Sequence, residues 1–199
     1  FAAAALVVLL AGPLYGWHDA GHAILSRASL LALPEDMPAF FRSAGREIAH
    51  YVYEPDVSKD QRSAPYVRAS ERAEHYLDLE FLQGAALPKY RHEYIALCCS
   101  LGVQPEAVGY LPYAVAEWSQ RLAVAFSEHR AWPDNAMVRA KCLVYAGFLA
   151  HYAQDLCQPL HLTIHWDGRA NPDGSSPRSG IHGQVDWLVE MLGPDPAGL

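Results

Sequence analysis

Residues 134–157 read DNAMVRAKCLVYAGFLAHYAQDLC, and this stretch decides the fold class. Its apolar residues recur at helical spacing, with no alternation of the kind that marks a strand. The dipeptide Trp132-Pro133 precedes it and Gln158-Pro159 follows it. Because proline interrupts helices, these dipeptides mark the two ends. We therefore predict a helix over residues 134–157.

The same spacing extends along most of the chain, and strand-like runs are scarce. Further helices are predicted over residues 19–32, 37–53, 69–82, 89–101, 106–129 and 179–192. The longest irregular stretch is residues 165–180, rich in Gly, Pro, Ser and Asn. With 199 residues, about half of them apolar, the chain can bury one full core. We predict an all-α fold in which residues 17–199 form a single-domain multi-helix bundle.

Residues 1–16 read FAAAALVVLLAGPLYG and carry no charge. The apolar part, residues 2–11, is shorter than the roughly 20 residues that a membrane-spanning helix needs. It resembles the apolar part of a secretory signal whose basic start is missing, so we predict a truncated signal peptide over 1–16. A buried N-terminal helix is the alternative. A signal peptide implies a secreted or periplasmic protein.

Four cysteines, Cys98, Cys99, Cys142 and Cys157, fit an oxidising compartment and lack CxxC spacing. We expect one or two disulfides, or buried thiols, rather than zinc ligands.

Ten histidines in so short a chain suggest metal binding, and two pairs of residues carry that hypothesis. His151 precedes Asp155 by four residues, which places both side chains on one helix face. His182 and Asp186 repeat the arrangement, and Pro159 turns His161 back towards the first pair. Imidazole with carboxylate suits a catalytic zinc site. A hydrogen-bonded surface pair is the ordinary alternative for either pair alone.

A third segment, Trp17-His18-Asp19-Ala20-Gly21-His22, precedes the first predicted helix. Asp19 can cap that helix, and His22 lies in its first turn. Without further support, both residues would be ordinary polar residues at a helix start.

In chain order, the chemistry-bearing residues are Trp17 with Gly21-His22, Asp56, His75-Tyr76-Leu77-Asp78, His151 to His161 with Gln158-Pro159-Leu160, Asp167 to Asn171, and His182 with Asp186. In this order the sequence resembles the superfamily of zinc-dependent phospholipases C and single-strand-specific nucleases. These are secreted phosphodiesterases with three zinc ions. Family members are longer at the C-terminus, so the resemblance implies an incomplete domain here.

The resemblance implies a trinuclear zinc site in the centre of the bundle. One zinc would be held by Asp56, His75 and His151, and a second by His161, His182 and Asp186. The third would be held by His22 and by the amine and carbonyl of Trp17, the mature N-terminus. Asp155 would bridge the first and third ions. The resemblance also implies that Asp56 and Asp155 are the catalytic residues, because they would hold the ions whose shared hydroxide would attack phosphorus.

Four further residues match positions that bind substrate in the nucleases of the family. Tyr76 would stack on a base and Asp78 would hydrogen-bond it, whereas Lys59 and Asn171 would lie near the phosphate. The formal net charge of −7 argues against a polyanionic substrate. Three divalent ions would add six positive charges and leave about −1, which removes that objection.

The favoured interpretation is therefore an endonuclease that hydrolyses single-stranded DNA or RNA, with 3′-nucleotidase activity left open. A phospholipase C acting on lipid head groups is the closest alternative. A second is an intracellular helical phosphohydrolase built on a His-Asp dyad such as His18-Asp19. A non-catalytic secreted helical binding protein is the alternative of another class. No protein partner is evident from the sequence.

Overall fold

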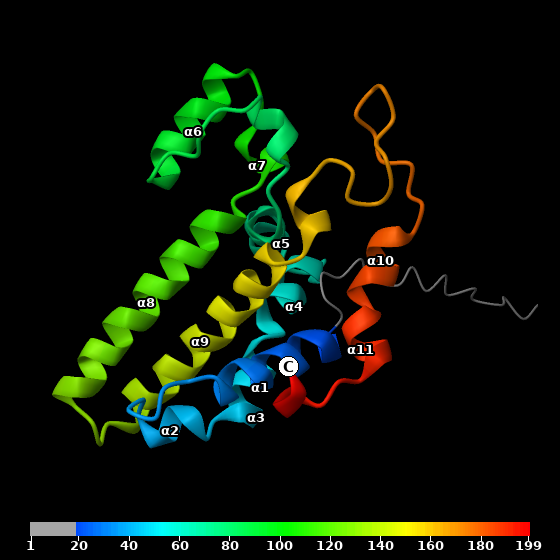
Figure 1. Cartoon of the computed structure of the whole chain (residues 1–199). Coiled ribbons are helices and arrows are strands. Elements are labelled where there is room, and N and C mark those ends of the chain that lie inside the picture. The colour runs from blue at the N-terminus through cyan, green and yellow to red at the C-terminus, as the bar shows by residue number, and fades with distance from the viewer. Residues whose placement is uncertain (1–18) are drawn as a thin grey trace, which may run out of the picture.

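The computed structural model describes residues 19–199. Two helices of 21 residues each are the longest elements of the bundle (Figure 1). These are α8 (Leu111–Ala131) and α9 (Ala136–Leu156), which pack against each other along their length. Pro112 lies in the first turn of α8. Asn135 caps α9 by accepting hydrogen bonds from the backbone amides of Met137 and Val138.

Shorter helices lie at the ends of this pair and on the side of α9 away from α8 (Figure 1). They are α1 (Asp19–Leu31), α2 (Ala39–Arg42), α3 (Gly45–Tyr51), α4 (Glu54–Asp60), α5 (Pro65–Arg72), α6 (Arg91–Ser100), α7 (Pro105–Val108), α10 (Ile181–Asp186) and α11 (Leu188–Leu192). Four single turns of 3-10 helix complete the fold: η1 (Ala73–His75), η2 (Leu79–Leu82), η3 (Pro159–Leu162) and η4 (Pro196–Gly198). Residues 19–199 contain no strand, so the all-α prediction is confirmed.

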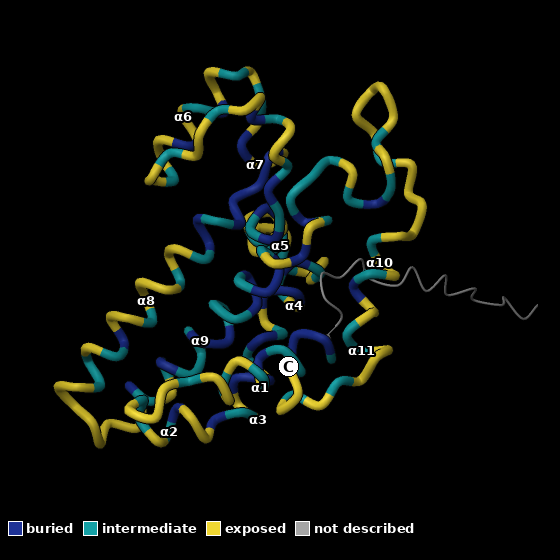
Figure 2. The backbone as a smooth tube through the Cα atoms, in the orientation of Figure 1, coloured by how far each residue is buried: buried dark blue, intermediate teal, exposed yellow. Residues whose placement is uncertain are grey.

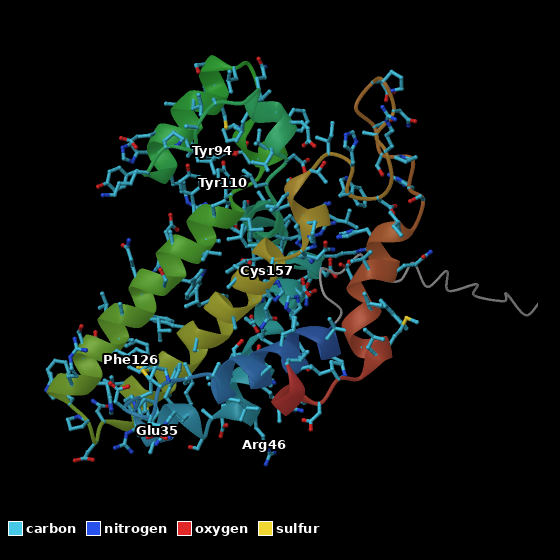
Figure 3. The ribbon with its side chains drawn as sticks, viewed as in Figure 1. Glu35, Arg46, Tyr94, Tyr110, Phe126 and Cys157 are labelled. Atoms are coloured by element: carbon cyan, nitrogen blue, oxygen red, sulfur yellow. The ribbon has the colours of Figure 1, made fainter. Side chains whose placement is uncertain are left out.

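The apolar core has two main clusters at opposite ends of the α8–α9 pair (Figure 3). In one, Tyr94 of α6 packs against Tyr110 at the start of α8. In the other, Phe41 of α2 packs against Phe126 of α8. Buried positions of α1, α4 and α9 face one another in the region between the two clusters (Figure 2). This region carries the polar residues discussed below.

Several predicted helix boundaries are wrong, and tertiary contacts explain the largest error. The predicted helix 69–82 is instead α5 followed by two 3-10 turns with an extended segment between them. There the amide of Leu77 donates to the carbonyl of His161 at 2.8 Å, and the amide of Asp78 donates to the carbonyl of Val108 at 2.7 Å. These long-range bonds replace the local bonds of a helix.

The remaining differences are interruptions and one omission. The predicted helices 37–53, 106–129 and 179–192 are each divided in two, near Ser43, Gly109 and Trp187. Gly109 has φ +99°, which no helix accommodates. No helix was predicted over the residues of α4 (Glu54–Asp60).

The cysteines are free thiols, with Cys98 and Cys142 buried, so the buried-thiol alternative describes these two. Within the described part of the chain, no helix has the length and apolarity required to cross a membrane. The predicted signal segment 1–16 and Trp17 lie outside the described residues.

Candidate metal centre

Eight of the side chains predicted to bind metal meet between the two core clusters. They come from six elements: His22 from α1, Asp56 from α4, His75 from η1, His151 and Asp155 from α9, His161 from η3, and His182 and Asp186 from α10. Seven are buried and His182 is half-buried. Three groups could each hold a metal ion: His22 with Asp56 and His151, His75 with His151 and Asp155, and His161 with His182 and Asp186.

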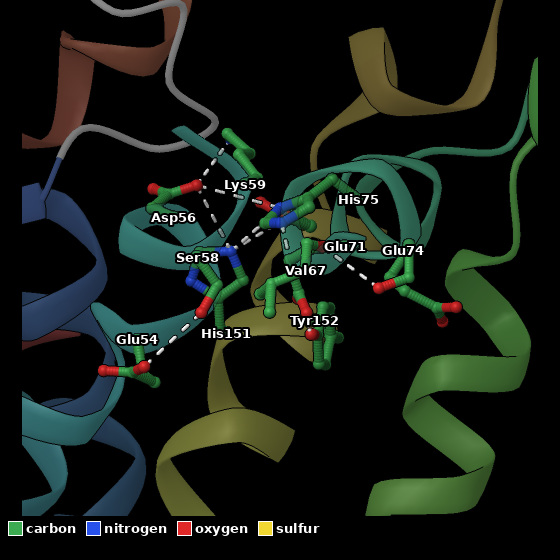
Figure 4. Close-up of polar contacts among 12 residues, drawn as sticks. Glu54, Asp56, Ser58, Lys59, Val67, Glu71, Glu74, His75, His151 and Tyr152 are labelled. Atoms are coloured by element: carbon green, nitrogen blue, oxygen red, sulfur yellow. Dashed lines mark hydrogen bonds and ion pairs between the residues drawn. The ribbon is translucent and has the colours of Figure 1, made fainter. Parts of the chain in front are cut away.

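The first site gathers residues from α4, η1 and α9 (Figure 4). His75 Nδ1 lies 3.0 Å from His151 Nε2 and 2.9 Å from Asp155 Oδ2, which is 3.3 Å from His151 Nε2. Asp56 Oδ1 lies 3.7 Å from His151 Nε2 and 3.8 Å from His75 Nδ1. Ligands about 2.0–2.1 Å from a tetrahedral zinc are about 3.3 Å apart. These separations therefore suit a shared metal ion.

The hydrogen bonds of His151 fix which of its nitrogens faces this site. Its Nδ1 lies 2.8 Å from the carbonyl oxygen of Val52, which can only accept, so Nδ1 carries the proton. In the neutral ring, Nε2 then has a bare lone pair directed at the Asp56 and Asp155 oxygens. Two acceptors facing a lone pair repel it unless a metal ion or a shared proton, such as one on His75 Nδ1, lies between them. A backbone carbonyl that orients a histidine in this way is usual at metal sites.

Asp155 joins the first site to its neighbours. Its Oδ2 faces His75 and His151, whereas its Oδ1 lies 3.6 Å from His22 Nε2 and 3.4 Å from His161 Nδ1. His22 stacks on His151, with ring centroids 4.1 Å apart, and its Nδ1 lies 2.6 Å from Gln154 Oε1. The two oxygens of Asp155 thus face different groups, as a bridging carboxylate requires.

The second site lies where η3 meets α10. His182 Nε2 is 3.3 Å from Asp186 Oδ2. The buried amide of Gln158 donates to Asp186 Oδ1 at 2.8 Å and so holds the carboxylate in place. Buried Asp167 accepts from the backbone amide of His182 at 3.2 Å. His182 and Asp186 are therefore each held by a hydrogen bond to a residue other than these two.

Burial sets the protonation states of the centre. It lowers the pKa of His22 to about 3 and that of His75 to about 4, so both rings are neutral near pH 7. Burial alone would raise the pKa of Asp155, but the imidazoles of His161 and His151 bring it well below its ordinary value. Neutral imidazoles beside an ionised carboxylate are the forms that bind metal.

Two further groups, Asp186 and Lys59, have pKa values raised above their ordinary values. Burial raises the pKa of Asp186 to about 7, although the hydrogen bond from Gln158 and the charge of Lys59 oppose the rise. Lys59 is buried with its Nζ 2.5 Å from Asp56 Oδ1. Burial lowers the pKa of Lys59, but Asp56 and Asp155 raise it more, so the ammonium stays charged.

Several nitrogen and oxygen atoms that could bind metal in this centre are buried without a hydrogen-bond partner among residues 19–199. They are His22 Nε2, Asp155 Oδ1, both ring nitrogens of His161, His182 Nε2 and Asp186 Oδ2. An unsatisfied buried polar group costs about 1–3 kcal/mol, so a cluster of them is rare in a packed core. The donor set fits divalent metal ions that prefer nitrogen and oxygen ligands.

A pocket of about 280 Å³ opens beside the centre. Three of its lining residues belong to the centre: His75, His161 and His182. Lys59, Tyr76 and Asp78 also line it, so three of the four predicted substrate residues lie together. Burial, followed by the charge of Glu80, raises the pKa of Asp78 to about 7. The Tyr76 hydroxyl donates to the carbonyl of Glu106 at 2.7 Å, which fixes the ring.

The fourth residue that was predicted to bind substrate, Asn171, is not among the residues that line this pocket. It is exposed, and its amide donates to Ser175 Oγ at 3.0 Å in the long loop. Conversely, Arg72 and Trp166 line the pocket but were not predicted to bind substrate. Arg72 lies three residues before His75. If the helix had been predicted to end at Arg72, this spacing would have suggested that Arg72 lies near the pocket. The position of Trp166 had no comparable signal.

Comparison of the chain with models of protein families, with curated proteins and with solved structures found no match.

Proposed function

We propose that the protein is a zinc-dependent phosphodiesterase of the nuclease type, with single-stranded nucleic acid as its substrate. The observation that supports this most directly is the convergence of five histidines and three aspartates, with Asp155 in contact with four of the histidines and with ligand atoms spaced as metal ligands are. The ligand sets are Asp56, His75, His151 and Asp155 for one zinc, and His161, His182 and Asp186 for another. His22 and Asp155, with Trp17, would serve a third.

Bound zinc supplies a Lewis acid for phosphate oxygens and lowers the pKa of water, which provides a nucleophile near neutral pH. The chain's own residues bind and orient the substrate. The ammonium of Lys59 lies at the wall of the pocket, where it can attract a phosphate oxygen. The ring of Tyr76 offers a face on which any base can stack.

Asp78 completes this assignment. It lines the same pocket as Tyr76 and is two residues away along an extended segment. When ionised, its carboxylate accepts hydrogen bonds from the N–H groups of a stacked base. An aromatic face beside a carboxylate suits a stacked base; the same pair could bind the quaternary ammonium of a choline head group, so the test below compares both substrates.

The test combines metal content with hydrolysis. The protein starting at Trp17 should contain close to three zinc ions per chain by elemental analysis and should digest single-stranded DNA in a chelator-sensitive way. If the protein binds zinc and cleaves a choline phospholipid but does not digest DNA, it is a phospholipase C instead of a nuclease. A folded protein that binds no zinc would refute it and favour a helical binding protein.

A further inference from the structure

Helix α5 carries two arginines, Arg68 and Arg72, one turn apart. Residues at this spacing lie on the same helix face, about 5–6 Å apart at Cβ. No residue of α5 is buried in the core. Arg72, at its C-terminal end, lines the pocket together with Lys59 and His75. The two arginines therefore extend from the pocket wall along an outer helix.

Both guanidinium groups interact with Asp60 only at long range and make no hydrogen bond or ion pair among residues 19–199. No hydrogen bond or ion pair among residues 19–199 holds Arg72, and Arg68 Nε is buried without a hydrogen-bond partner. Arg91 shows the contrast, because it makes hydrogen bonds of 2.6–3.0 Å to Glu74 and Glu117. A guanidinium left unpaired beside a pocket is available to a ligand.

One carboxyl group lies near both arginines. Burial raises the pKa of Asp60, and the charges of Arg68 and Arg72 oppose that rise. The Lys59 ammonium is already paired with Asp56, whereas neither guanidinium group has a carboxylate at ion-pair distance among residues 19–199. Helix α5 therefore carries two positive charges without a close counter-charge in a chain whose net charge is −7.

We infer that Arg68 and Arg72 form a strip that binds successive phosphates of a single-stranded nucleic acid, beside the phosphate in the pocket. This rests on the proposed function. Guanidinium groups match phosphate in geometry and charge. A phospholipid carries its phosphodiester at the reacting position and has no neighbouring phosphate for a strip outside the pocket. A polynucleotide has one at every residue, and Tyr76 and Trp166 offer aromatic faces for its bases.

The experiment compares two double variants of the zinc-loaded protein. Arg68→Ala/Arg72→Ala removes the strip. Arg27→Ala/Arg46→Ala removes the same charge from exposed positions of α1 and α3 that do not line the pocket. The probe is a fluorescent thymidine oligonucleotide of about ten residues. Its phosphorothioate linkages slow hydrolysis. Its dissociation constant is measured by anisotropy over a series of sodium chloride concentrations, and thermal unfolding confirms that both variants fold.

Removing two phosphate contacts should reduce the salt slope of log K by about 1.4 and weaken binding about 25-fold at 0.1 M salt, whereas the control keeps the wild-type slope. An unchanged slope, or an equal change in both variants, would overturn the inference. So would Arg68- and Arg72-dependent binding to phosphatidylserine vesicles without an effect on the oligonucleotide. A changed slope in a protein that neither binds zinc nor cleaves phosphodiesters would refute the proposed function and retain the strip.

Discussion

His151 Nε2 and Asp155 Oδ2 lie 3.3 Å apart on consecutive turns of α9, with both side chains fully buried. The proton of His151 is on its other nitrogen, which donates to the carbonyl of Val52. The pair therefore presents two acceptors to one space rather than a donor to an acceptor. Without a metal ion, a proton has to be shared in this space, either on His151 Nε2 or on His75 Nδ1, which lies 3.0 Å away. Burial lowers the pKa of His151, but Asp155 and Asp56 raise it more.

Replacing His151→Ala should remove a ligand from this space. We expect the zinc content to fall by at least one ion per chain and hydrolysis of single-stranded DNA to fall more than about 100-fold, beyond the loss typical of changes around the ligands. Elemental analysis and a digestion assay measure the two effects. His92→Ala, at an exposed position of α6, is the matched control and should change neither. Normal zinc content in the His151 variant would remove this residue from the ligand set.

Gln158 should matter without contacting metal itself. Its amide holds Asp186 Oδ1, and its carbonyl oxygen accepts from the amide of Leu160. Gln158→Ala should weaken zinc binding about 10- to 100-fold, because the carboxylate loses its orientation. Competition with a chelator of known affinity measures this. Gln120→Ala, exposed on α8, should leave the affinity as it is; equal affinities for both variants would contradict the role.

Five of the eight side chains in the candidate centre could be predicted from local sequence pattern, whereas His22, Asp56 and His75 were expected from the family resemblance. The spacing of His151 to Asp155 and of His182 to Asp186 places each pair on one helix face, and the structure has both pairs on helices. The pattern also identified His161 after the proline that ends α9. Local periodicity was sufficient for these residues, since the information needed lies within one or two turns.

The conformation around Tyr76 could not be predicted in the same way. Its neighbours Leu77 and Asp78 are extended because they bond to backbone groups of His161 and Val108, which are distant in sequence. Helical periodicity contains no information about such bonds. The same limit hid Trp166, whose place in the pocket depends on how the long loop folds back.

The ring of Tyr76, rather than its hydroxyl, should bind substrate. Tyr76→Ala should raise KM for an oligonucleotide about 5- to 150-fold, corresponding to about 1–3 kcal/mol of lost stacking. Tyr76→Phe keeps the ring and loses the bond to the Glu106 carbonyl, so it should lower stability by about 1 kcal/mol with a much smaller change in KM. Steady-state kinetics and thermal unfolding separate the two effects. Similar KM values for the Ala variant and the wild type would exclude stacking.

Gly147 should be required for the approach of α3 to α9. A Cβ at this position would lie 2.4 Å from Tyr51 Cβ and 2.7 Å from the Tyr51 carbonyl carbon. Tyr51 precedes Val52, whose carbonyl orients His151, so Gly147→Ala should lower the free energy of unfolding by about 1–3 kcal/mol and also weaken zinc binding. Gly183→Ala in α10 meets no atom within 4 Å and should not destabilise the protein. Denaturant titration of both variants tests this difference.

Asp78 should make stability depend on pH, because burial and Glu80 raise its pKa from 3.8 to about 7 in the folded protein. Between these values the folded state keeps a proton that the unfolded state has lost, so this carboxyl group favours folding at low pH. That contribution is lost as the pH rises through about 7. Asp78→Asn stays neutral, so it should raise the unfolding temperature relative to wild type more at pH 8 than at pH 5. Asp36→Asn, at an exposed turn, should show no such difference between the two pH values. If Asp78→Asn shifts the unfolding temperature equally at both pH values, the carboxyl group is already ionised at pH 5 and its hydrogen-bonding role towards a base would extend to acidic conditions.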